Sequence, residues 1–204
     1  MGLKASGGSY PTGLRRREKI IDTAMRLFGA GGYHATPMSA VAEAVGISEG
    51  GLAHHFPSKK VLLQAVAERR LIETASWWEA QPGSESGLAV LDQMVEATRR
   101  FTDQPGLIEL FVLSISEAAD ASSPAHARLA GQYNGVVESL VARWQAAVDK
   151  GEIRPDVDLE LVARECIAVS DGLQIQWVLS NGTVDIVAGV AEFSESLKAR
   201  LRVP

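Results

Sequence analysis

Residues 36–63 read TPMSAVAEAVGISEGGLAHHFPSKKVLL, and this stretch decides the fold. After Thr36, a residue type that caps helix N-termini, the apolar residues recur at helical spacing until Gly46 ends the pattern. Ser48 is placed to cap a second short helix over about residues 49–55. Two short helices joined by a tight glycine turn predict a helix-turn-helix.

The second of these helices has one narrow apolar face. Only Leu52 and Phe56 can be buried, because they lie one helical turn apart, and the other faces stay free. A preceding helix over about residues 15–30 is expected to pack against the pair, and the glycines within residues 29–32 end it. A phosphate-binding loop at these glycines is a poor alternative, because no strand precedes them and the GK[ST] ending is missing.

The rest of the chain also shows helical rather than alternating apolar spacing, so the sequence predicts an all-α protein. Further helices are expected at about residues 59–78, 87–102, 105–119, 124–150, 159–180 and 184–201. The polar, turn-rich residues 81–87 are the best linker candidate. We nevertheless place the domain boundary within the long connecting helix. The predicted units are a disordered or non-native start at residues 1–13, a three-helix helix-turn-helix domain at 14–66, and a helical effector-binding and dimerisation domain at 67–204.

The net charge of −5 is unevenly distributed along the chain. Residues 1–75 hold ten Lys and Arg against six acids, a balance of +4, which leaves −9 for the remainder. A basic head on an acidic body suits a protein that contacts a polyanion at one end. Because the sequence shows neither a membrane-spanning apolar run nor a signal-peptide pattern, we expect a cytoplasmic protein without membrane contacts.

The sequence offers no chemistry typical of an enzyme. The single cysteine, Cys166, lies in an apolar stretch and is expected to be a buried thiol. His54 and His55 project about 100° apart on a helix, and neither His34 nor His126 has a partner one turn away, so no metal site is predicted. Because nucleophile-elbow and zinc-protease motifs are also missing, we expect neither a catalytic site nor a cofactor.

The quoted stretch closely resembles the N-terminal domain of the TetR (tetracycline-repressor) family of bacterial transcriptional regulators. The resemblance is strong over about residues 15–70, and its most specific positions, in register, are Ala42, Gly46, Ser48, Leu52, His55-Phe56, Pro57-Ser58-Lys59 and Leu62. The body resembles the family in helical content and length. The resemblance implies a homodimer that binds an operator in double-stranded DNA.

The resemblance also implies roles for individual residues. Residues 48–56 would form the recognition helix, and basic groups and helix N-termini would attract DNA phosphates. The residues expected at phosphates are Thr36, Ser39, His55 and Lys59. A basic cluster at the start of the first helix would either reach the DNA as an arm or form a solvated helix start, and it comprises Arg15, Arg16, Arg17 and Lys19.

The recognition helix departs from the commoner family pattern at Glu49, Gly51 and Ala53. With Gly50 also present it carries few long side chains, so Glu49 and His54 are the main candidates for contacts with base edges. Each glycine costs a helix about 1 kcal/mol relative to alanine. We therefore expect this helix to be loosely held, with fast amide exchange, when DNA is absent.

The aromatic residues of the body lie on helical faces, where core packing and an effector pocket are both open interpretations. Polar residues inside otherwise apolar stripes favour a pocket, because ligand pockets combine apolar walls with a few polar anchors. The candidate pocket residues are Trp77, Met94, Phe101, Phe111, Tyr133, Trp144, Ser170, Gln174 and Trp177. The resemblance implies that a small-molecule effector bound there changes the spacing of the two heads.

The last two predicted helices carry apolar stripes that suit a two-fold, four-helix interface, as in the family. The candidate interface residues are Val162, Cys166, Val169, Leu173, Val187, Val190, Ser194, Leu197 and Leu201. Such a dimer would present two recognition helices one DNA turn apart, about 34–36 Å, on a palindromic operator.

The sequence thus predicts a sequence-specific DNA-binding transcriptional regulator, a repressor that a small-molecule effector releases. A small-molecule sensor or carrier that has lost DNA binding remains an alternative, because the recognition helix is so sparse in side chains. Activation instead of repression, and an all-α enzyme with an unrecognised cleft, also remain open.

Overall fold

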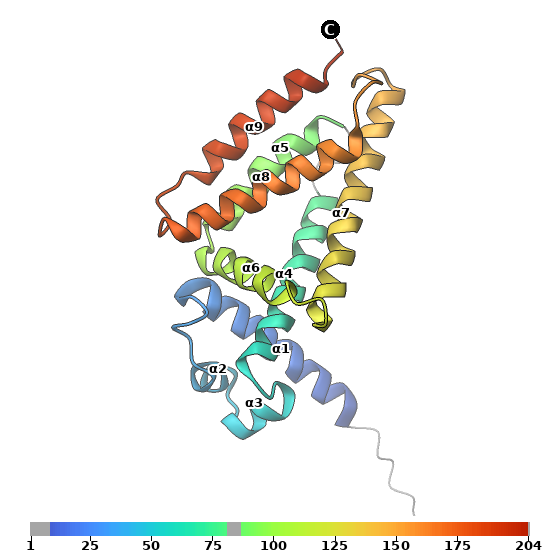
Figure 1. Cartoon of the computed structure of the whole chain (residues 1–204). Coiled ribbons are helices and arrows are strands. Elements are labelled where there is room, and N and C mark those ends of the chain that lie inside the picture. Colours follow the sequence, from blue (N-terminus) through green and yellow to red (C-terminus); the bar gives the residue numbers. More distant parts are fainter. Residues whose placement is uncertain (1–8, 81–86, 204) are drawn as a thin grey trace, which may run out of the picture.

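The computed structural model describes residues 9–80 and 87–203, and it is built from α-helices (Figure 1). These are α1 (Ser9–Gly31), α2 (Met38–Val45), α3 (Glu49–His55), α4 (Lys59–Glu79), α5 (Ala89–Thr102), α6 (Pro105–Ala118), α7 (Pro124–Asp149), α8 (Leu159–Leu179) and α9 (Ile186–Leu201). Within these ranges no strand forms, and a lone antiparallel bridge joins Ile153 to Arg202. The all-α prediction is therefore confirmed.

The predicted helix limits agree with the observed ones to within about two residues, except at the N-terminus. There α1 begins at Ser9, so residues 9–13, which were expected to belong to a disordered start, are helical. The linker predicted at residues 81–87 lies almost wholly outside the described residues. Among the helices that are described, none is both long and apolar enough to cross a membrane.

The helix-turn-helix is closed by the caps that the sequence predicts. Gly46 ends α2 in the left-handed conformation, with φ at 80°. The Ser48 hydroxyl accepts a hydrogen bond from the Gly51 amide at 3.1 Å and so caps α3. Ser58 caps α4 in the same way, by accepting from the Val61 amide at 3.2 Å. These caps fix where α2, α3 and α4 begin and end.

Thr36 is the exception, because it does not cap α2. Pro37 occupies that N-cap position without a side-chain hydrogen bond. The Thr36 hydroxyl instead donates to the Gly32 carbonyl at 2.9 Å, which closes the C-terminus of α1. The predicted cap is thus wrong, because the chain turns back at Gly32, with φ at 79°, and brings Thr36 under α1.

The head, which we define as α1–α3 and residues 59–66 of α4, packs around one apolar core. Its essentially fully buried side chains come from all four helices and from Phe56 directly after α3, and the helical ones include Ile20, Ala24, Phe28, Val41, Leu52, Leu62 and Val66. Leu107 and Leu110 of α6 belong to the same core. Gly106 permits this approach, because a Cβ there would lie 1.9 Å from the Phe28 carbonyl oxygen.

The body, comprising α5–α9 and the rest of α4, has a second core formed mainly by α5, α7, α8 and α9 (Figure 1). Trp144 is fully buried there, and its indole N–H donates to the Gly87 carbonyl at 2.9 Å. Cys166 is buried as predicted, and burial raises the pKa of its thiol to about 12. Such a thiol is inert at neutral pH.

Helix α4 runs from the head into the body (Figure 1). Its first turns carry an apolar face, with Leu62, Ala65 and Val66 buried. Ile72, farther along the same helix, is 55% exposed. One turn beyond Val66, the buried residue is Arg70.

Candidate functional site

Helix α3 turns one face inward and leaves its other faces exposed. The inward face consists of Leu52 and Phe56, both essentially buried, as the spacing predicts. The exposed residues of α3 are Glu49, Gly50, Ala53 and His54. The helix therefore presents a shallow surface of small residues on which His54 and Glu49 are the long polar side chains.

Two members of the basic cluster on α1 contact residues that precede and follow α3. The Arg17 guanidinium lies over the Phe56 ring, 5.0 Å from its centre. The Lys19 ammonium donates to the Val45 carbonyl at the end of α2, at 3.0 Å. Arg15 and Arg16 are exposed on the same helix. The cluster is thus divided between side chains that position α2 and α3 and side chains turned to solvent.

Further polar groups flank α3. Lys59 lies over the Tyr33 ring, 4.4 Å from its centre, and donates to the His34 carbonyl at 3.4 Å. Partial burial lowers the pKa of Lys59. Ser39 is exposed in the first turn of α2. Thr36 is only 7% exposed, so its hydroxyl supports α1 and contributes little to this surface.

His55 lies close enough to Arg16 and Arg17 for their positive charges to act on it. The pKa of His55 is lowered first by partial desolvation and then by His54, Arg16 and Arg17. A nearby cation disfavours a second positive charge, whereas an anion would favour it. The surface around α3 is thus suited to an anionic partner.

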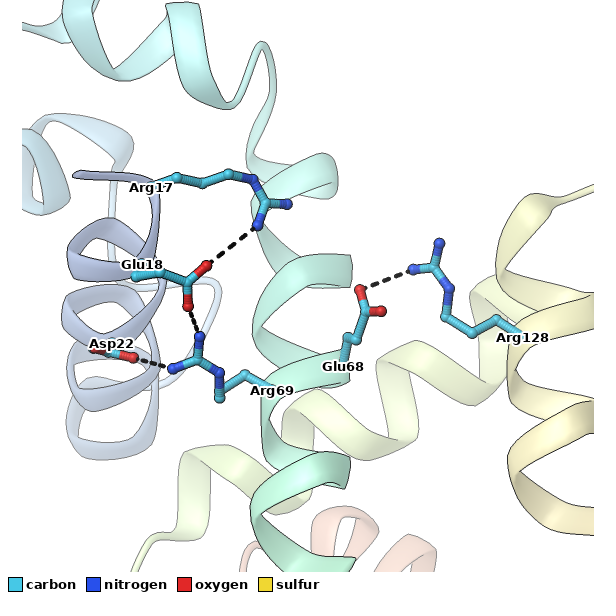
Figure 2. Close-up of polar contacts among 6 residues, drawn as sticks. All are labelled: Arg17, Glu18, Asp22, Glu68, Arg69 and Arg128. Carbon is cyan, nitrogen blue, oxygen red and sulfur yellow. Dashed lines mark hydrogen bonds and ion pairs between the residues drawn. The ribbon is translucent and has the colours of Figure 1, made fainter. Parts of the chain in front are cut away.

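Adjacent residues of α4 connect the head to the body (Figure 2). Arg69 pairs with Glu18 and with Asp22 of α1, the latter at 2.6 Å. Glu68, the preceding residue, faces the other way and pairs with Arg128 of α7 at 3.2 Å. Two neighbouring residues of α4 thus contact α1 and α7.

Several predicted pocket residues gather around a buried polar cluster in the body. Phe101 and Phe111 lie under the Arg70 guanidinium, with ring centres at 4.6 and 5.7 Å. Gln174 is 4% exposed, and its amide N–H donates to the Ser170 carbonyl at 3.4 Å. The Tyr133 hydroxyl donates to the Asp171 carboxylate.

The centre of this cluster, Arg70, was missed by the sequence analysis. Its signal was a charged residue one turn beyond the buried Val66, on an otherwise apolar helix face. The neighbouring Arg69 pairs with Glu18 and Asp22 of α1. Consecutive arginines on a helix point about 100° apart, so the sequence alone does not say which one is buried.

Other predicted pocket residues lie elsewhere. Trp144 and Met94 belong to the second core, and the full burial of Trp144 makes it a packing residue. Trp177 packs under the turn between α8 and α9, where a Cβ on Gly182 would lie 3.1 Å from its ring. The Arg100 guanidinium lies over the Trp77 ring, 4.9 Å from its centre. The predicted set thus divides between the polar cluster, the core and the surface.

A groove opens between α4, α6 and α7. Most of its accessible wall is apolar and comes from residues such as Leu63, Ala67, Leu71 and Leu129. Charged residues also line it, namely Glu68, Glu117 and Arg128. Nothing in the sequence pattern indicated it, because its walls come from three separate helices.

The predicted pairing surface is wrong for most of its residues. Six of the nine side chains are less than 5% exposed, so they have no area left to bury against a partner, and they are Val162, Cys166, Val190, Ser194, Leu197 and Leu201. The stripes face α5 and α7 of the same chain. Val169, Leu173 and Val187 are partly exposed.

The opposite face of α8 is exposed and partly apolar. Leu161, Ile175 and Leu179 are 55%, 39% and 78% exposed, and they follow one helical stripe with Ala168 and Gly172. A Cβ on Gly172 would meet no atom within 4 Å, so the middle of the stripe is also open.

Comparison with known proteins finds family matches for both the head and the body. Residues 20–66 match the family model of bacterial regulatory proteins of the tetR family, and residues 88–202 match that of the BetI-type transcriptional repressor C-terminal domain. The transcriptional regulator UidR of Escherichia coli strain K12 is 28% identical over 189 residues, covering 91% of this chain and 90% of UidR.

Two solved structures show the same fold. A TetR transcription regulator from Haloarcula marismortui matches with a TM-score of 0.77 at 18% identity, covering 93% of this chain and all of the other. A putative transcriptional regulator from Saccharomonospora viridis in complex with choline matches with a TM-score of 0.71 at 19% identity, covering 94% and 100%. With one family model on the head and another on more than half of the chain, this protein belongs to the TetR family of DNA-binding transcriptional regulators.

Proposed function

We propose that the protein is a homodimeric repressor that binds a palindromic operator in double-stranded DNA and is released by a small-molecule effector. The observation that carries the proposal is the exposure of α3, which Leu52 and Phe56 anchor from one side while basic side chains flank it. A major groove is wide enough to admit such a helix. Because its target is chromosomal DNA, we propose that the protein acts in the cytoplasm.

In this proposal Glu49 and His54 contact base edges, with Glu49 suited to accept from a cytosine amino group. Gly50 and Gly51 let the helix backbone approach the bases closely. The surrounding side chains contact phosphates, which position the head without reading sequence. These are Arg15, Arg16, Ser39, His55 and Lys59.

We propose that two copies pair through the exposed stripe of α8, which contains Leu161, Ile175 and Leu179. Exposed apolar residues gathered on one helix face are typical of a protein interface. A two-fold axis beside α8 places the stripe of one copy against the same stripe of the other copy. Pairing would set the distance between the two copies of α3.

We further propose that the effector binds in the body, near the Arg70 cluster and the groove between α4, α6 and α7. Both α4 and α6 also contact the head, through the Arg69 ion pairs and the Gly106 approach to Phe28. An effector that binds one arrangement of these helices better than the other would shift the separation of the heads. The choline complex of the Saccharomonospora viridis relative supports a small-molecule site in this fold.

The proposal is tested by selecting bound DNA from a random pool with the full-length protein. We expect enrichment of a palindrome whose half-sites lie about one helical turn apart. Fluorescence anisotropy on that DNA should then show affinity falling steeply with salt, as phosphate contacts require. Failure to enrich any sequence, with no salt-dependent binding, would favour the alternative of a sensor that has lost DNA binding.

A further inference from the structure

The most unusual side chain of the body is Arg70, because it is a charged group placed in the interior. It is only 9% exposed, and its guanidinium lies against Phe101 of α5 and Phe111 of α6. Desolvation lowers the pKa of Arg70 to about 10, while Asp171 opposes that shift. Buried charges are normally paired, because an isolated ion in an apolar interior is unfavourable.

The hydrogen bonding of Arg70 is incomplete. A guanidinium carries five N–H donors, and the hydrogen bond found for Arg70 among the described residues is one long bond to the Gln174 side-chain oxygen, at 3.5 Å. Across the described ranges, no carboxylate lies within 4 Å of it. The adjacent Arg69 pairs with both Glu18 and Asp22.

The carboxylate whose charge acts on Arg70 already has a hydrogen-bond partner. Asp171 accepts a hydrogen bond from the Tyr133 hydroxyl. Burial raises the pKa of Asp171, although Tyr133 and Arg70 oppose that effect. Its carboxylate is therefore poorly placed to attract a cationic ligand, whereas Arg70 retains donors suited to an anion.

The groove between α4, α6 and α7 is not lined by this cluster itself, but two of its lining residues lie one helical turn from cluster members. Ala67, which lines the groove from α4, is one turn before Arg70, and Leu129, which lines it from α7, is one turn before Tyr133. Residues three or four apart share a helix face. Arg70 and Tyr133 therefore lie about one helical turn, along α4 and α7, from residues that line the groove.

We propose that the effector is a carboxylic acid with an apolar body, whose carboxylate binds Arg70 while its apolar part occupies the groove between α4, α6 and α7. This inference rests on the proposed function, because it names the chemical class of the effector. The planar guanidinium matches a carboxylate in two parallel hydrogen bonds. Phe101, Phe111 and the groove residues would supply the apolar surroundings that a ligand pocket needs.

The test compares octanoate, phenylacetate and 4-phenylbutyrate with their neutral primary amides, using isothermal titration calorimetry on the full-length protein. We expect at least one acid to bind roughly tenfold or more tightly than its amide, because the amide lacks the charge-assisted bonds. The Arg70→Gln variant should lose that preference. Arg154→Gln, at an exposed ion pair with Asp156, serves as the matched control and should keep it.

A second variant keeps the test decisive if Arg70→Gln does not fold. Asp171→Asn removes the negative charge whose field reaches Arg70, so it should tighten binding of the same acid severalfold. The inference would be overturned if no acid bound, if the amides bound equally well, or if Asp171→Asn weakened acid binding.

Operator release separates this inference from the proposed function. An acid that binds through Arg70 without displacing the selected operator would support the proposed ligand class and refute the proposal that the ligand releases the protein from DNA. A neutral or cationic compound that displaces the operator, while the acids do not, would refute the proposed ligand class and support the proposed repressor function.

Discussion

The head and the body use apolar helix faces in different ways. In the head, α3 has an apolar face of two residues, Leu52 and Phe56, and its remaining surface is exposed. In the body, α8 is apolar on two faces, one covered by its own chain and one exposed at Leu161, Ile175 and Leu179. A narrow apolar stripe thus identifies the buried side of a helix, whereas a wide one does not say what covers each part.

The largest expected effect follows from breaking the exposed face of α8. Ile175→Glu places a charge in the centre of the proposed interface, where it would be desolvated without a partner. The dimer should dissociate, and operator affinity should fall about a hundredfold or more because binding of the two heads is no longer linked. Analytical ultracentrifugation and anisotropy measure both effects. A stable dimer with unchanged affinity would place the interface elsewhere.

A second substitution tests the joint between head and body. Gly106→Ala would place a Cβ against the Phe28 carbonyl, so α6 must move away from α1. The free energy of unfolding should fall by about 3 kcal/mol, at the upper end of overpacking costs. Gly131→Ala is the control, because a Cβ there meets no atom within 4 Å, and it should raise stability by about 0.5–1 kcal/mol. Urea denaturation measures both changes.

Two substitutions near α3 should separate positioning from sequence reading. Lys59→Ala should weaken binding of all duplexes about equally and make the salt dependence shallower by about one unit. His54→Ala should change which sequences are enriched, at a cost of about 1–3 kcal/mol on the preferred site. Anisotropy at several salt concentrations distinguishes the two patterns. Identical effects from both would contradict the division of roles.

The glycines of α3 offer a smaller test of the head. Gly50→Ala should stabilise the helix by about 1 kcal/mol, since the nearest atom to a new Cβ is the Ser48 hydroxyl oxygen at 4.0 Å. Hydrogen exchange on the protein without DNA should show increased protection across residues 49–55. Strong protection there before the substitution would contradict the expectation of a loosely held helix.

The smallest expected effect is a pH dependence. The pKa of His55 is lowered in the protein without DNA, and a nearby phosphate would raise it in the complex. The complex then binds more protons than the separate partners, so operator affinity should increase as pH falls, by about threefold between pH 7.5 and 6.5. The His55→Gln variant should show a weaker dependence on pH.

The sequence predicted the helices and the buried anchors of α3 because these depend on local spacing and caps. It failed where the outcome depended on contacts between distant elements. Thr36 bonds to Gly32 because the chain reverses under α1. Arg70 is buried because α5 and α6 bring Phe101 and Phe111 against it. The α9 stripe around Leu197 is covered by its own chain, which the periodicity of α9 alone does not reveal.

The contribution of α6 to the head core has a consequence for exchanging parts between related regulators. Leu107 and Leu110 are far from residues 14–66 in sequence, yet they complete the core that those residues form. A graft of the N-terminal segment alone onto a foreign scaffold would leave this apolar surface uncovered. The unit that can be transplanted is therefore discontinuous, and a hybrid repressor should inherit α6 together with α1–α4.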